Sequence, residues 1–193
     1  MSKIEEKKER LLNVAQSIFS RFGLFKTTID EIAKAARVGK SSIYYYFKSK
    51  EDIFKAVVEK ELKTLKEKIN QALVNIDNPQ EKLKVFILTR MKYLRELANI
   101  YNALQNDYLE HYAFVQKLRT DYDNEEIILI KEILQKGIQE ERFAIDDVEL
   151  TSTVILVTLK GVEFEWSTKF NENEIEKNID KLLDLLFNGI LRR

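Results

Sequence analysis

Four residues between positions 41 and 48 have the side chains and the spacing of a nucleic-acid contact surface. Ser41, Tyr44, Tyr45 and Lys48 follow one another at i, i+3, i+4 and i+7, which places them on one face of a helix. Lysine and serine groups can bond phosphates or base edges, and tyrosine offers a flat apolar ring with a hydroxyl at its tip. We name these four residues the recognition face. Their chemistry indicates contact with the major groove of DNA.

Two short helices joined by a tight turn are expected to hold the recognition face. The first covers residues 28–36, with Thr28 as its N-cap and Glu31 completing a capping box. Its apolar side consists of Ile29, Ile32, Ala33 and Ala36. Residues 37–39 break the pattern, and the second helix covers residues 40–47. The buried side of the second helix is Ile43, Tyr46 and Phe47.

Helices on either side complete the amino-terminal domain. A helix over residues 4–22 is predicted, and Gly23 is a natural C-terminal stop. The apolar stripe of this helix consists of Leu11, Ala15, Ile18, Phe19 and Phe22. Ser49 is expected to cap a long helix over residues 49–76, where Lys50 stands at an amino terminus that can hold a phosphate. The prediction is a three-helix DNA-binding domain over residues 1–48, joined by this helix to the remainder, residues 49–193.

Residues 27–50 resemble the TetR family of transcriptional regulators. The matching segments are TTIDEIA at 27–33, VGK at 38–40 and IYYYFKSK at 43–50. Arg37 and Ser41 stand where the family usually has glycine. A non-glycine residue in a left-handed turn costs on the order of 1 kcal/mol, and Arg37 adds positive charge beside the DNA.

The resemblance and the side-chain chemistry together define the expected DNA contacts. The hydroxyl, aromatic and lysine groups of residues 40–48 are expected at bases or phosphates, while Thr27, Thr28 and Lys50 hold the DNA backbone. The full set is Thr27, Thr28, Arg37, Lys40, Ser41, Ser42, Tyr44, Tyr45, Lys48 and Lys50.

Composition points to a helical protein without thiol chemistry. The 193 residues include one proline, five glycines and 45% apolar residues, which favours a nearly all-helical chain. There is no cysteine, so disulfides and thiolate metal sites are excluded. The amino terminus is charged, and the longest strongly apolar run, residues 154–159, is too short to span a bilayer. We therefore expect a cytoplasmic protein without a membrane partner.

The net charge of zero conceals an asymmetry. Residues 1–50 hold 11 Lys and Arg residues against 5 acids, a net charge of +6, so the remaining chain carries −6. A basic domain followed by an acidic one is typical of a DNA-binding domain joined to a domain that does not bind DNA.

Further helices are predicted over residues 80–104, 106–119, 123–141, 147–169 and 172–191. The resemblance implies an apolar effector cavity among them. Arg90 lies on the apolar stripe of the 80–104 helix, where a charge is costly to bury unless paired. It meets either an acidic ligand group, or an internal carboxylate, or it extends to the edge of the bundle; we favour the last two alternatives over the ligand. The candidate cavity residues are Phe86, Arg90, Met91, Leu94, Tyr108, Tyr112 and Trp166. The alternative is that these residues only pack the core of the domain.

The last two predicted helices carry more apolar surface than one bundle needs. They are expected to form half of a four-helix interface in a homodimer, although they are alternatively the core of a monomer. The expected interface residues are Leu156, Leu159, Trp166, Ile179, Leu182, Leu183, Leu186 and Ile190. A dimer also suits the roughly 34 Å between successive turns of a palindromic site.

The fold predicted is all-α, with a helix-turn-helix head and a larger ligand-binding and dimerisation bundle. We expect a repressor that binds a palindromic operator in double-stranded DNA as a homodimer and is released by a small lipophilic effector.

Two other classes of protein were weighed against this one. An all-helical enzyme is disfavoured because the chain has no nucleophile motif, phosphate loop or paired Glu-x-x-His signature. His111 is the only histidine, so neither a multi-histidine metal site nor a histidine-based relay with a cysteine can be assembled, and we expect it to be a surface or packing residue. No catalytic residue, metal site or cofactor is expected. A helical adaptor that no longer binds DNA is disfavoured by the intact recognition face.

Overall fold

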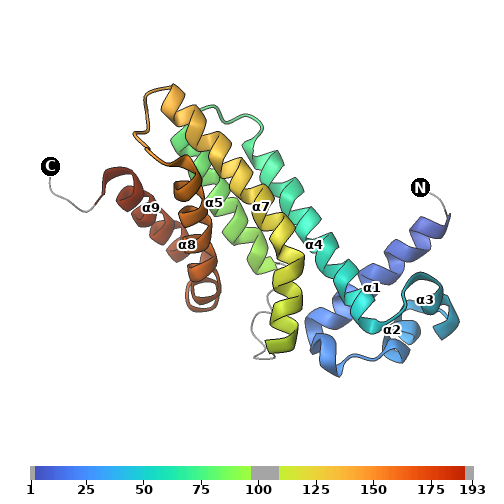
Figure 1. Ribbon diagram of the computed structural model, residues 1–193. Coiled ribbons are helices and arrows are strands. Elements are labelled where there is room, and N and C mark those ends of the chain that lie inside the picture. Colours follow the sequence, from blue (N-terminus) through green and yellow to red (C-terminus); the bar gives the residue numbers. More distant parts are fainter. Residues whose placement is uncertain (1–2, 97–108, 190–193) are drawn as a thin grey trace. The chain divides into compact units, whose positions relative to one another are not determined.

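A computed structural model describes residues 3–96 and 109–189 of the chain. Within these residues there are eight helices and no strand. They are α1 (Lys3–Lys26), α2 (Ile29–Ala36), α3 (Lys40–Tyr46), α4 (Lys50–Leu73), α5 (Pro79–Glu96), α7 (Leu109–Gln139), α8 (Val148–Lys169) and α9 (Glu172–Asn188). Of these helices, none is sufficiently long and apolar for a transmembrane span. The all-α prediction is confirmed (Figure 1).

The chain divides into two compact units. The first includes residues 3–64 and the start of α7, and the second includes residues 65–96 and 119–189. Helix α4 therefore contributes residues to both units.

In the first unit, α1 packs on α2, and α2 packs on α3. Leu11, Ala15 and Phe19 of α1 are buried, and the Phe19 ring meets Phe54 of α4 edge to face at 5.3 Å. Phe22 was expected in this core, but 51% of it is exposed. The reason is the kink at Gly23, where φ is 77°, which ends the regular helix and buries Leu24 instead.

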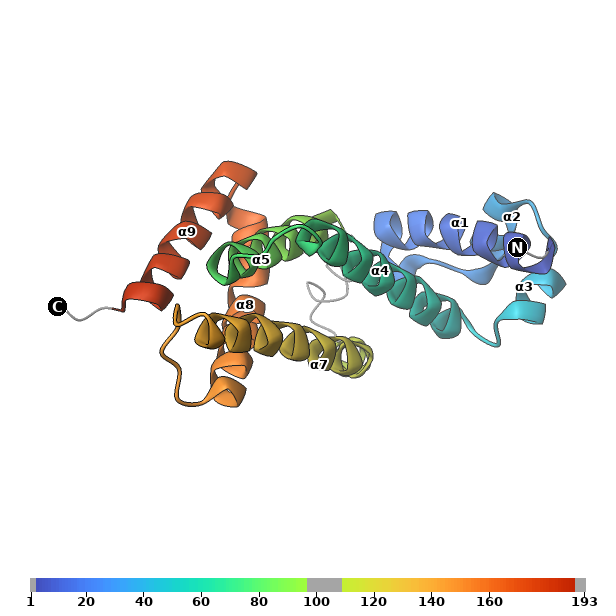
Figure 2. The same cartoon turned by 90° about the horizontal axis from the view of Figure 1, so that it is seen from above.

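In the second unit, α5 packs against both α8 and α9, which diverge from the turn that joins them (Figures 1 and 2). The helix pattern of α9 is confirmed at its buried residues, Ile175, Ile179 and Leu183. A short loop between α7 and α8 folds back on the unit. Its Phe143 ring stacks on Phe187 of α9 with centroids 5.6 Å apart, and a Cβ atom at Gly137 would lie only 2.0 Å from the same ring.

The predicted break between residues 119 and 123 was wrong, and the helix expected over 49–76 ends earlier, at Leu73. Separate helices over residues 106–119 and 123–141 were expected, but α7 runs without a break from Leu109 to Gln139. No glycine or proline occurs in α7 before Gly137, and Tyr122, in the expected break, is buried. Burial of that ring favours continuing the helix over ending it.

Candidate nucleic-acid interface

The first helix of the DNA-binding pair is fixed at its start by a capping box. The backbone N–H of Glu31 donates to Thr28 Oγ1 at 3.2 Å, and the N–H of Thr28 donates to the Glu31 carboxylate at 2.7 Å. These hydrogen bonds from Thr28 lower the pKa of the Glu31 carboxyl below its ordinary value. The cap predicted from the sequence is confirmed.

The turn between α2 and α3 uses a left-handed residue that is not glycine. Arg37 has φ 54° and ψ 46°, and the N–H of Val38 donates to the Ala33 carbonyl at 3.0 Å. From α1, Arg10 Nη2 donates to the Ala36 carbonyl at 3.1 Å. Both bonds satisfy carbonyls that the end of a helix leaves free, which helps to hold Arg37 in this conformation.

Helix α3 presents three residues of the recognition face, Ser41, Tyr44 and Tyr45, to solvent. The fourth, Lys48, was expected on the same helix but follows its end, because the C-cap Phe47 is extended. On the buried side, Ile43 is fully buried and Phe47 is 6% exposed, whereas Tyr44 is 50% and Tyr45 72% exposed. Ser41, Ser42 and Lys48 are also exposed. The Tyr45 ring meets the Tyr46 ring edge to face at 4.9 Å, and beyond that contact a ring this open to water has little role in the protomer's own packing.

Lys40 begins α3 beside this face and is held by an acid. Its ammonium group lies 2.9 Å from the Asp30 carboxylate of α2, and both side chains are at least half exposed. The hydrogen bond to Asp30 raises the pKa of Lys40 above its ordinary value. To bond a phosphate, the Lys40 ammonium group must break its ion pair with Asp30 or hydrogen-bond to both groups at once.

The remaining predicted DNA contacts differ in their surroundings. Thr28 is exposed, and Lys50 is half-buried at the start of α4, where Ser49 caps the helix by accepting a hydrogen bond from the Asp52 N–H at 3.0 Å. Thr27 departs from the prediction. It is buried, and its hydroxyl donates to the Gly23 carbonyl at 2.7 Å, so its side chain fixes the link between α1 and α2.

In the second unit, Arg90 is internally paired. Its side chain is fully buried; Nε donates to both Glu126 carboxylate oxygens at 2.9 and 3.1 Å, and Nη1 donates to Glu163 at 3.1 Å. Burial alone would lower the pKa of Arg90, but attraction to these two carboxylates raises it. The internal salt bridge, one of the two alternatives that we favoured over a ligand contact, is confirmed.

The other candidate effector residues are partly described. Phe86 and Met91 are buried, and Trp166 is half-buried. The side chains of Leu94, Tyr108 and Tyr112 lie outside the described residues.

The α8 and α9 helices differ in detail from the expected interface. Four of the expected interface residues are already buried within one chain, namely Leu156, Leu159, Ile179 and Leu183. Leu182 and Trp166 are half-buried, Leu186 is 43% exposed, and Ile190 lies outside the described residues. Among the side chains of these two helices that the structure describes, the exposed large apolar ones are Leu150, Val154, Val157, Leu185 and Leu186. Leu150 and Val157 of α8 are not among the apolar residues expected at the interface, because α8 is apolar around most of its girth and periodicity does not identify its outward side.

Comparisons with known proteins match both parts of the chain. The profile of bacterial regulatory proteins of the tetR family matches residues 11–57, and that of the QacR-like protein C-terminal region matches residues 60–192. The transcriptional regulator QacR of Staphylococcus aureus is 25% identical over 189 residues, which cover 95% of this chain and 97% of QacR.

Solved structures share the fold. The fatty acid degradation regulator FadR from Bacillus halodurans is 24% identical over 97% of each chain, with a TM-score of 0.75. FadR from Bacillus subtilis in complex with stearoyl-CoA is 24% identical, covers 95% of this chain and 99% of that chain, and has a TM-score of 0.73. One family profile matches the amino-terminal domain, and the other covers more than half of the whole chain. The protein therefore belongs to the TetR family of DNA-binding transcriptional regulators.

Proposed function

We propose that this protein is a repressor that binds a palindromic operator as a homodimer and leaves it when a small lipophilic effector binds. The observation that carries the proposal is the recognition face. It combines the 72% exposed ring of Tyr45 with Ser41 on the short helix α3, whose other side is buried, and with Lys48 just beyond the end of that helix. Such a helix enters a major groove without disturbing the core that supports it.

An apolar groove supports the dimer. It has a volume of about 290 Å³ and lies between α8 and α9, where Val154, Leu185 and Leu186 contribute exposed side chains. Two such surfaces brought together by a two-fold axis would bury apolar area on both copies. The same axis would present two recognition faces to the two halves of a palindrome.

The proposal of a lipophilic effector has weaker but specific support. Phe86 and Met91 are buried apolar residues of α5. The FadR relative from Bacillus subtilis was solved with stearoyl-CoA. Long-chain fatty acids and acyl-CoA thioesters are therefore the first compounds to test. Release would follow by linkage if the effector binds the DNA-free form more tightly.

A mobility-shift experiment tests the function. The full chain is titrated onto DNA flanking its own coding region at two salt concentrations, with unlabelled competitor DNA. We expect a discrete, competitor-resistant complex of one dimer per site that weakens with salt. Acyl-CoA is then added to the preformed complex and is expected to release the DNA. Diffuse binding to every fragment tested, abolished by competitor, would contradict specific operator recognition.

A further inference from the structure

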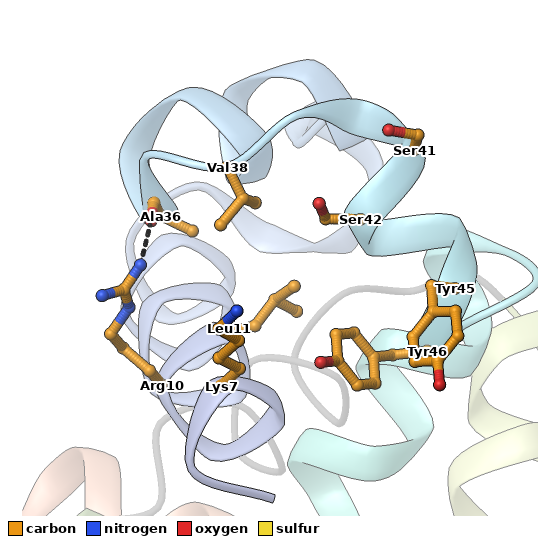
Figure 3. A pocket seen from close by; sticks show the side chains of 9 residues that line it. All are labelled: Lys7, Arg10, Leu11, Ala36, Val38, Ser41, Ser42, Tyr45 and Tyr46. Carbon is orange, nitrogen blue, oxygen red and sulfur yellow. Dashed lines mark hydrogen bonds between the residues drawn. The ribbon is translucent and has the colours of Figure 1, made fainter. Parts of the chain in front are cut away.

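A second basic site lies beside the recognition face, between α1 and α3. It is a pocket of about 390 Å³ within the first unit. Figure 3 shows Lys7, Arg10 and Leu11 entering it from α1, and Ser42 and Tyr46 facing them from α3. None of these three α1 residues belongs to the DNA contacts expected from the sequence.

The charges in the pocket are of one sign. Two of its described lining residues are cations and none is acidic. Lys7 makes no hydrogen bond or ion pair with another described residue. Arg10 is held at the edge of the pocket by its bond to the Ala36 carbonyl, 3.1 Å long. A fixed guanidinium, a lysine without a partner among the described residues, and nearby hydroxyl donors suit a phosphate oxygen.

The apolar part of the pocket narrows the choice of ligand. Leu11 and Val38 line it together with the polar groups. A phosphodiester in a nucleic-acid strand carries an apolar sugar edge next to its charge, whereas an isolated phosphate ion does not. Ser41 and Tyr45 of the recognition face also line the pocket. A duplex that contacts that face therefore brings a phosphate strand close to the pocket.

We propose that this pocket seats a backbone phosphodiester of the operator, with Lys7 as the main cation, so that α1 is a DNA-contacting helix in addition to α2, α3 and the start of α4. This inference rests on the proposed binding of operator DNA by α3. It adds a contact that fixes the position of the duplex without reading its sequence.

The test compares two neighbouring lysines in the full-length protein. Lys7→Gln removes the pocket cation. The matched control, Lys8→Gln, removes the same charge one residue further along α1, where the ammonium lies over the Phe47 ring at 5.5 Å and lines no part of the pocket. Operator affinity is measured from about 50 to 300 mM salt for the parent and both variants, and circular dichroism verifies that each is folded.

We expect Lys7→Gln to weaken operator binding roughly tenfold at 0.1 M salt. It should also reduce the slope of log K against log salt by about 1.8, because a dimer loses two phosphate contacts at about 0.9 each. Lys8→Gln should leave the slope unchanged. A scan with single methylphosphonate substitutions should find one phosphate per half-site whose neutralisation weakens the parent but not Lys7→Gln.

Other results would overturn the assignment in distinct ways. If the parent binds the operator and Lys7→Gln retains its affinity and salt slope, the pocket assignment fails while the proposed function stands. If the parent binds no DNA specifically, both fail. A third outcome combines two results: inorganic phosphate raises the melting temperature of the parent but not of Lys7→Gln, and the parent and Lys7→Gln have the same salt slope in operator binding. The site then belongs to a free phosphorylated molecule instead.

Discussion

Arg90 and Glu126 are joined by two hydrogen bonds from a single nitrogen, Nε, to the two oxygens of one carboxylate, at 2.9 and 3.1 Å. They come from α5 and α7, and both side chains are almost completely excluded from solvent. With Glu163 of α8 on Nη1, the guanidinium links three helices of the second unit.

Replacement of Arg90 should therefore be strongly destabilising. Arg90→Met keeps much of the volume but leaves two buried carboxylates without their cation, a loss of about 3–5 kcal/mol in the free energy of unfolding. Urea denaturation measures this loss. Adding Glu126→Gln to the variant should recover part of it, which a double-mutant cycle quantifies.

The control for Arg90 is a surface ion pair in the same unit. Lys84 lies 2.6 Å from Asp180 with both side chains more than a third exposed, so Lys84→Met should cost at most about 1 kcal/mol. Equal losses in Lys84→Met and Arg90→Met would mean that the buried pair contributes no more than the exposed one.

Tyr45 should contribute to DNA binding and not to folding. We expect Tyr45→Ala to weaken operator binding by roughly thirtyfold or more, because the dimer loses one base contact of at least about 1 kcal/mol in each half-site, with unchanged helical content and dimer. Tyr45→Phe separates the ring from the hydroxyl, and intermediate binding would assign a share to each. If Tyr45→Ala binds as tightly as the parent at every salt concentration, α3 is not the helix in the groove.

Asp30 should restrain DNA binding, because it holds Lys40. Asp30→Asn removes the carboxylate 2.9 Å from the ammonium, and we expect roughly two- to fivefold tighter binding to DNA of any sequence at low salt. Glu59→Gln is the matched control, since Glu59 is paired with Lys55 of α4 at 3.9 Å. Equal gains in both variants would show that only total charge matters.

Val154 should be essential for the dimer while leaving the protomer folded. It lines the apolar groove of α8 and α9 and is 52% exposed, so a carboxylate there meets water in the monomer but would be buried in the dimer. Sedimentation should show that Val154→Asp is a folded monomer that has lost operator binding. Ile128→Asp is the control, because Ile128 of α7 is 54% exposed outside this groove. A Val154→Asp variant that stays dimeric would place the interface elsewhere.

The local chemistry of the head was predictable from the sequence. The cap depends on two residues three positions apart, Thr28 and Glu31, and the buried side of α3 follows from the positions of Ile43 and Phe47. The internal partner of Arg90 was predictable as a class, because a buried cation needs a carboxylate. Its identity was not, since Glu126 and Glu163 lie 36 and 73 residues away in the sequence.

The predictions failed where contacts between distant parts of the chain determine how a side chain is placed. Thr27 and Thr28 are adjacent and chemically identical, but the first points to the Gly23 carbonyl and the second caps α2. The stripe of α1 extends in sequence to Phe22, beyond the point at which Gly23 changes the course of the backbone. The α1 side of the basic pocket was overlooked because Lys7 and Arg10 are remote in sequence from the motif that they adjoin in the fold.

The crowding of Phe143 against Gly137 also limits how this protein can be engineered. Replacing a glycine inside a helix with alanine ordinarily stabilises it by about 1 kcal/mol, and the sequence gives no reason to treat Gly137 and Gly161 differently. An added methyl group at Gly161 of α8 meets no atom of the described residues within 4 Å, whereas at Gly137 it would displace the Phe143 ring from its stack on Phe187. The same substitution is thus a stabilising design at one position and a way to detach the α7–α8 loop at the other.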